Sequence, residues 1–220
     1  MPYPQDLVGK YIDYRVDPGG NMGSGMAGML VDGVLPGQTT AAAVAVYTAG
    51  APVPGQPLAV QNTVPWNFTF LKYFGGAVTT ASLAGAVLTG PMSGCYLCRY
   101  TRGGQNLAHI GTANAQDSEA SIAVKAAWRT FEAREDVSVV EGGTPFDYFP
   151  TSEFQAAMLS PSRIPMVVGY FDAGSAYSML LAPVPGNMNP AGLTLLKVAA
   201  VKTMTLQPWA TIGAMRTFRG

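Results

Sequence analysis

The amino-acid sequence predicts a sheet-dominated α/β (α+β) fold with mostly antiparallel strands. Several short runs alternate apolar and polar residues, as half-buried strands do. Only one long run has the apolar spacing of a surface helix. Strand and helix patterns do not alternate along the chain, so the parallel sheet of a βαβ protein is not expected.

The clearest strand is expected at residues 66–73, where alternation places Trp66, Phe68 and Phe70 on one face. Two pairs of runs are expected to form hairpins, around residues 102–104 and 172–174. All the expected strands span residues 10–16, 41–48, 66–73, 82–88, 95–101, 105–112, 165–171, 175–182 and 193–206.

A helix is expected from Asp117 or Ser118, either of which can cap it, to about residue 135. A shorter helix is expected at residues 152–159, with Thr151 as its cap. The glycine-rich run at residues 19–29 contains G-x-G-x-x-G, but no helix can follow it. A loop or kinked strand is therefore expected there, and no dinucleotide site.

Length and composition limit the classes of protein to which this chain can belong. The 220 residues suit a single domain, residues 1–220. Thirteen basic and thirteen acidic residues leave no net charge, which argues against nucleic-acid binding. No apolar run is long enough for a membrane span, and no classical signal peptide is visible. We expect synthesis in a reducing cytoplasm, and export without a cleaved leader stays open.

The residues whose side chains could take part in catalysis are concentrated at positions 89–112. This stretch holds both cysteines, Cys95 and Cys98, and the single histidine, His109. A cysteine is a good nucleophile as a thiolate, and a nearby imidazole can deprotonate it. Judged by residue type alone, such residues are more often structural. Three ligands are too few for a closed zinc site, and no cofactor or metal is expected.

The hairpin leaves two registers open. With a two-residue loop His109 faces Cys98, whereas with a three-residue loop it faces Leu97 and lies diagonal to Cys95. The residue pattern alone does not decide between them.

One motif in this stretch indicates a specific chemistry. It is the segment Met92-Ser93-Gly94-Cys95, with Thr89 six positions before the cysteine and His109 fourteen positions after it. It resembles the signature of the cytotoxic necrotizing factor and Burkholderia lethal factor glutamine deamidase toxins. Met92 stands where that family has leucine, and the resemblance covers about a tenth of the chain.

The resemblance implies a mostly antiparallel β-sandwich flanked by a few helices and long loops. It implies Cys95 as nucleophile, His109 as base, and Thr89 hydrogen-bonded near the imidazole or the substrate amide. The backbone at Ser93 and Gly94 would approach the oxyanion. The implied partner is a host or target protein that bears the glutamine to be converted. The sequence is also compatible with an oligomer.

This interpretation requires Cys95 and His109 to share a solvent-reachable pocket in which the imidazole ionises the thiol. Asn106, Gln116 and Asp117 are candidates for orienting His109. Two alternatives stay open: a non-catalytic binding or self-assembling protein, and a papain-like protease or transglutaminase.

Overall fold

The computed structural model describes residues 3–14, 34–35, 39–63, 65–113, 115–161, 163–215 and 218. The helices are α1 (Glu119–Glu132), α2 (Thr151–Ala157) and α3 (Trp209–Ala214), with 3-10 turns η1 (Pro4–Leu7), η4 (Pro145–Tyr148) and η5 (Gly186–Met188). The strands are β1 (Tyr11–Asp13), β2 (Val34–Leu35), β3 (Thr39–Val44), β4 (Val46–Ala49), β5 (Val60–Asn62), β6 (Trp66–Leu71), β7 (Ala77–Ser82), β8 (Val87–Thr89), β9 (Tyr96–Thr101), β10 (Gln105–Gly111), β11 (Ser138–Gly143), β12 (Met166–Phe171), β13 (Ala176–Pro183), β14 (Leu195–Thr203) and β15 (Gln207–Pro208).

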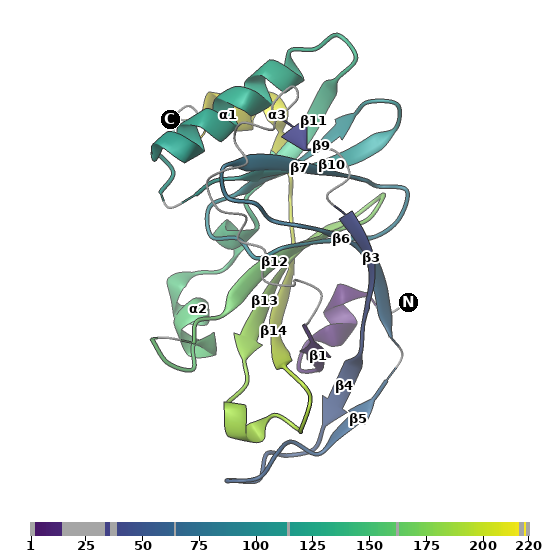
Figure 1. The fold of residues 1–220 in the computed structure, drawn as a ribbon, viewed down its shortest axis with the longest axis vertical. Helices are drawn as coiled ribbons and strands as arrows, with labels where there is room; N and C mark the ends of the chain where they lie inside the picture. Colours follow the sequence, from purple (N-terminus) through teal and green to yellow (C-terminus); the bar gives the residue numbers. More distant parts are fainter. Residues whose placement is uncertain are drawn as a thin grey trace.

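The strands form two sheets, as Figure 1 shows. The nine-stranded sheet has the order β3-β6-β8-β12-β13-β14-β1-β4-β5, and the six-stranded sheet has the order β15-β11-β9-β10-β7-β2. Neighbouring strands are antiparallel except for β6 with β8 and β2 with β7. The predicted fold class, a mostly antiparallel β-rich α+β architecture, is confirmed.

The nine-stranded sheet curls back on itself. β3 and β4 are separated only by Ala45, yet β3 lies at one end of the strand order and β4 lies next to the other end. The carbonyl of Ala45 accepts a hydrogen bond from the backbone of Asp13, and Val44 and Val46 are both buried in one core. The chain thus joins the two ends of the sheet around that core.

Alternation in β6 fills the same core. Trp66, Phe68 and Phe70 are buried, as the sequence predicts, whereas Asn67 between them is exposed. The Trp66 ring stacks on Tyr170 of β12, with 5.4 Å between ring centroids. Packing of these large aromatic rings stabilises the nine-stranded sheet.

A second core holds the two sheets together. Leu97 and Leu107 of the six-stranded sheet pack with Leu71 and Phe171 of the other. Gly169 makes room for this contact, because a Cβ there would lie 2.5 Å from Leu97 Cδ1. Leu97 is therefore fixed between the sheets.

Helix α1 covers the outer face of the six-stranded sheet (Figure 1). The side chain of Ser118 accepts a hydrogen bond from the Ser121 backbone, so Ser118 rather than Asp117 caps the helix. Trp128 and Phe131 on the inner side of the helix pack edge-on against Tyr100 of β9. This packing fixes the outer face of the strand that follows Cys95.

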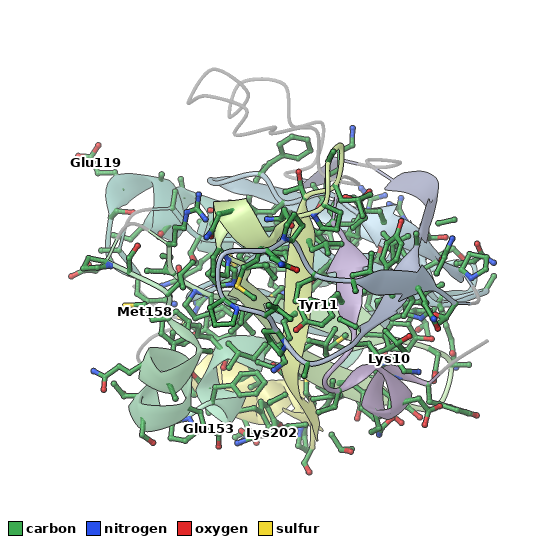
Figure 2. The ribbon with its side chains drawn as sticks, turned by 90° about the horizontal axis from the view of Figure 1, so that it is seen from below. Lys10, Tyr11, Glu119, Glu153, Met158 and Lys202 are labelled. Carbon is green, nitrogen blue, oxygen red and sulfur yellow. The ribbon has the colours of Figure 1, made fainter. Side chains whose placement is uncertain are left out.

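Helix α2 lies beside the nine-stranded sheet. Its Glu153 forms an ion pair with Lys202 of β14 at 2.5 Å, and both are labelled in Figure 2. The helix begins at Thr151 itself, and no side chain caps it, so the predicted cap is wrong.

Other expected elements match in part. Both predicted hairpins, the α1 region and the strand at residues 193–206 are present. The expected strand at residues 82–88 is wrong, because the chain turns at residues 84–85 between β7 and β8. The glycine-rich run at residues 19–29 lies outside the described residues.

Candidate active site

The segment that carries Cys95 passes from one sheet to the other. Thr89 ends β8 in the nine-stranded sheet, and Met92 still bridges to Val167 of β12. Tyr96 then begins β9 in the six-stranded sheet. Ser93 and Gly94, one exposed and one half-buried, make the crossing, so Cys95 lies where the chain enters the second sheet.

The register of the β9–β10 hairpin brings Cys95 and His109 to one face. His109 lies opposite Leu97, and Ala108 lies opposite Cys98, which is the register of the three-residue loop. Cys95 shares the inter-sheet core with Leu97, so it lies on the face of His109 and diagonal to it, a relation that spans about 7–8 Å. Cys98 faces α1 instead.

Cys95 is a buried thiol that is protonated at neutral pH. Its side chain is only 3% exposed. Burial raises its pKa to about 11, although hydrogen bonds from the Thr112 side chain and from the backbone of Thr112, Gly94 and Ser93 act in the opposite direction. The backbone at Ser93 and Gly94 therefore does stabilise negative charge at the sulfur, but less than burial opposes it.

His109 is a buried, neutral imidazole. Burial lowers its pKa to about 3. Neither Nδ1 nor Nε2 has a hydrogen-bond partner among the described residues. Buried polar atoms are nearly always paired, so an imidazole with two unpaired nitrogens needs an explanation. The ring lies against Tyr73, with 5.4 Å between ring centroids.

These values correct the expectation of an open, ionised pair. The structure has Cys95 and His109 on one face, but it covers both side chains. Transfer of the thiol proton to the imidazole is strongly unfavourable here, because the two pKa values, about 11 and about 3, favour the neutral pair. Desolvation is the physical reason in both cases.

Two residues missed from the sequence complete the surroundings of the thiol. The Thr112 hydroxyl lies 3.8 Å from the Cys95 sulfur, and the thiol lies 3.9 Å from the Thr112 carbonyl. The Tyr73 hydroxyl donates to that same carbonyl at 2.7 Å. Tyr73 ends the alternating run at residues 66–73, but nothing in the run itself indicates contact with the hairpin.

Thr89 does not bond the imidazole. Its Oγ1 accepts a hydrogen bond from the Gly169 backbone at 2.9 Å and lies 3.2 Å from the Gly90 carbonyl. Thr89 is fully buried, and it joins β8 to β12 within the nine-stranded sheet. These contacts give Thr89 a structural role.

The three candidates for orienting His109 do not contact its nitrogens either. Asn106 donates to the carbonyls of Arg102 and Gly104 in the hairpin loop. Asp117 acts electrostatically on Lys125. Gln116 donates from Nε2 to the Gly94 carbonyl, so it lies against the residue that precedes Cys95.

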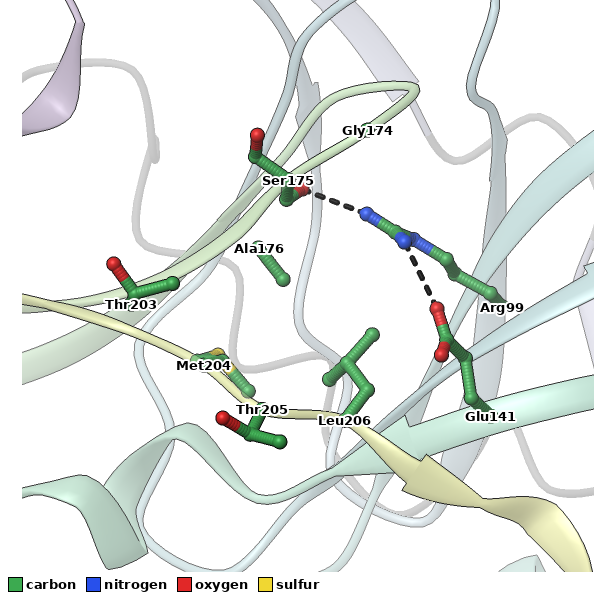
Figure 3. Close-up of a pocket in the computed structure, with 9 residues that line it drawn as sticks. All are labelled: Arg99, Glu141, Gly174, Ser175, Ala176, Thr203, Met204, Thr205 and Leu206. Carbon is green, nitrogen blue, oxygen red and sulfur yellow. Dashed lines mark hydrogen bonds and ion pairs between the residues drawn. The ribbon is translucent and has the colours of Figure 1, made fainter.

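A pocket of about 390 Å³ opens elsewhere between the sheets, and Figure 3 shows its lining. Arg99 pairs with Glu141 at 2.9 Å and donates to the carbonyls of Asp172 and Ser175. A smaller pocket of about 120 Å³ also touches Arg99 and Glu141. Neither pocket is lined by Cys95 or His109.

Comparisons with known proteins add no assignment. No protein-family model matches the sequence, and no curated protein matches it significantly. In the described part of the chain, no helix has the length and apolar character needed to cross a membrane. Among the same residues, no three His, Cys, Asp or Glu side chains are grouped so that they could hold a metal ion.

Proposed function

We propose that this chain is a cysteine-dependent glutamine deamidase that acts on a protein, in the manner of the toxins that its Ser-Gly-Cys segment resembles. One observation carries the proposal: His109 is buried on the same sheet face as Cys95 and diagonal to it, and neither of its nitrogens has a partner in the described part of the chain. A buried imidazole without partners is costly for a purely structural residue and suits a base that waits for a reacting group.

The chemistry follows from these two side chains. The Cys95 sulfur attacks the carboxamide carbon of a glutamine, while His109 accepts the thiol proton and passes it to the departing ammonia. Water, deprotonated by His109, then hydrolyses the thioester to give glutamate and the free thiol. Backbone groups of Ser93 and Gly94 lower the pKa of the Cys95 thiol, and in this proposal they would also stabilise the negative charge that develops on the carboxamide oxygen.

Activity requires the site to open. In the closed state the thiol and the imidazole are both neutral, because both are desolvated. Admission of water or of a polar substrate relieves the desolvation that separates the two pKa values. We therefore propose a resting form and an open, active form.

The test uses glutamine-to-glutamate conversion in a lysate, mapped by peptide mass spectrometry. The chain should convert particular glutamines and release ammonia without cleavage or cross-linking, which separates a deamidase from a protease or a transglutaminase. Cys95→Ser and His109→Met should abolish conversion, and the control Cys98→Ala, which alters the α1 face, should retain it. Undiminished conversion by Cys95→Ser would refute the proposal.

A deamidase of this kind would be a bacterial toxin or effector, made in the cytoplasm and then secreted or injected. Its virulence role would come from the modified host protein. Localisation of the epitope-tagged chain in the culture medium or in recipient cells tests this point.

A second candidate is a non-catalytic binding or self-assembling protein. The near-complete burial of Cys95 and His109 favours it, since structural side chains are buried in this way. Light scattering across a concentration series tests it. Concentration-dependent association, with no Cys95-dependent conversion of any glutamine, would support this candidate over the enzyme.

A further inference from the structure

The side-chain carboxamide of Gln116 lies against Gly94, the residue that precedes Cys95. Its Nε2 donates to the carbonyl of Gly94. A Cβ at position 94 would lie 2.6 Å from that nitrogen, 3.5 Å from Gln116 Cδ and 3.6 Å from Thr112 Oγ1. The same Thr112 hydroxyl lies 3.8 Å from the Cys95 sulfur. Glycine at position 94 thus leaves room for the Gln116 carboxamide against the backbone that leads into Cys95, on the side where Thr112 Oγ1 also lies.

This carboxamide is only half satisfied. Its oxygen, Oε1, is buried and has no hydrogen-bond partner among the described residues. An unpaired buried acceptor is unfavourable, so the amide gains less here than it would in water. The Gln116 carboxamide is therefore held weakly enough to move away from the Gly94 carbonyl.

We propose that Gln116 occupies, in the resting form, the subsite that receives the carboxamide of the substrate glutamine, and that it closes the site over Cys95. This inference rests on the proposed deamidase function and names how the same site recognises an amide. The Gly94 carbonyl accepts an N–H of the bound carboxamide. The product carboxylate has no N–H to donate and is repelled by that carbonyl, so the subsite favours substrate over product.

The backbone of Gln116 is held in place, so its side chain can move without the rest of the chain. Its backbone carbonyl accepts a hydrogen bond from Lys125 Nζ of α1 at 2.6 Å. The next turn of chain is fixed by the Ser118 cap. Rotation of the Gln116 side chain therefore frees the Gly94 carbonyl without any change in α1.

The experiment compares alkylation of Cys95 in the folded chain, in Gln116→Ala and in the control Gln155→Ala, whose glutamine is exposed on α2. Peptide mass spectrometry reads Cys95 and Cys98 separately. We expect Gln116→Ala to raise the rate of Cys95 labelling by iodoacetamide by at least about tenfold, because reactivity follows access. Gln155→Ala should match the parent chain. Cys98, fully buried, should stay unlabelled and so report an intact fold.

A matched reagent pair tests the amide subsite. Iodoacetamide carries a primary carboxamide, and iodoacetate carries a carboxylate in its place. In Gln116→Ala the iodoacetamide-to-iodoacetate rate ratio at Cys95 should exceed, by about tenfold, the ratio for the chain unfolded in denaturant. Gln116→Glu, which cannot donate to the Gly94 carbonyl, should also raise labelling and covers the case in which the alanine variant fails to fold.

The outcomes separate the two proposals. If Cys95-dependent deamidation is found but Gln116→Ala and Gln116→Glu leave both the rate and the ratio unchanged, the inference about Gln116 is wrong and the deamidase proposal stands. If both variants increase labelling and Gln116→Ala also raises the ratio, but no glutamine is converted, closure by Gln116 is supported and the deamidase proposal fails.

Discussion

Tyr73 and Cys95 share one hydrogen-bond acceptor, the carbonyl of Thr112. The Tyr73 hydroxyl lies 2.7 Å from it, and the thiol lies 3.9 Å from it. The Tyr73 ring also packs against His109. Tyr73, from the end of the β6 region, therefore contacts the imidazole and the carbonyl that borders the sulfur.

We expect Tyr73→Phe to lower the free energy of unfolding by about 1 kcal/mol, the usual loss for one hydrogen bond. It should also speed alkylation of Cys95 several-fold, because the Thr112 peptide loses its stronger donor. Urea unfolding and labelling measure the two effects. Tyr148→Phe is the matched control, since Tyr148 also donates to a backbone carbonyl at 2.7 Å, that of Thr205. Equal labelling in the two variants would contradict the role given to Tyr73.

His109 should make stability depend on pH. Its pKa is about 3 in the folded chain, against an ordinary value of 6.5. As pH falls below 6.5 the unfolded chain binds a proton that the folded chain does not, so the free energy of unfolding falls by about 1.4 kcal/mol per pH unit until pH approaches 3. Above 6.5 this contribution is constant.

Denaturant melts at pH 6.5, 6.0, 5.5 and 5.0 measure this slope, and His109→Met supplies the comparison. His109 is the single histidine, so the variant should lose most of the pH dependence in this window. An unchanged slope in His109→Met would mean that other groups cause it and that the imidazole is not desolvated.

Gly111→Ala should be strongly destabilising. A Cβ at position 111 would lie 2.1 Å from the Phe74 carbonyl and 2.9 Å from the Ala77 carbonyl, both backbone atoms that cannot rotate away. We expect a loss of more than about 3 kcal/mol in thermal or urea unfolding. Gly174→Ala, where a Cβ meets nothing within 4 Å, should leave stability nearly unchanged. A mild effect at Gly111 would refute the close approach of these two backbones.

Arg99→Met should weaken the contact between the sheets. Arg99 pairs with Glu141 of β11 and donates to carbonyls in the β12–β13 turn, at Asp172 and Ser175. Loss of these bonds should cost about 2–3 kcal/mol, measured by urea unfolding, because the guanidinium is largely buried. The control Arg102→Met removes an exposed pair with Asp136 and should barely shift the unfolding midpoint. Similar shifts in both variants would argue against the bridging role.

The sequence predicts the elements whose signal is local. The alternation of Trp66, Phe68 and Phe70 and the helical spacing of α1 appear in the structure as expected. β7 was missed because five of its six residues are buried, so it has no alternation to detect. The order of strands in each sheet depends on long-range pairing, which no short pattern carries.

In the candidate site, too, the local features were predictable from the sequence and the long-range contacts were not. The spacing within one hairpin is local, and it leaves two registers, of which the structure has the one that places His109 diagonal to Cys95. Tyr73 and Thr112 meet Cys95 because the turn after Tyr73 approaches Gly111 closely. Burial of the thiol and of the imidazole depends on the packing of two whole sheets, so their pKa shifts were not predictable from residue type.

The junction at Ala45 between β3 and β4 has a consequence for the durability of the nine-stranded sheet. β3 is the edge strand at one end of the sheet, and β4 is the second strand from the other end. Because these two strands follow each other directly in the chain, a single backbone cut between them would release both ends of the sheet. Cleavage at that peptide should therefore loosen β3 and β4 together and expose the aromatic core that they border, which would favour aggregation.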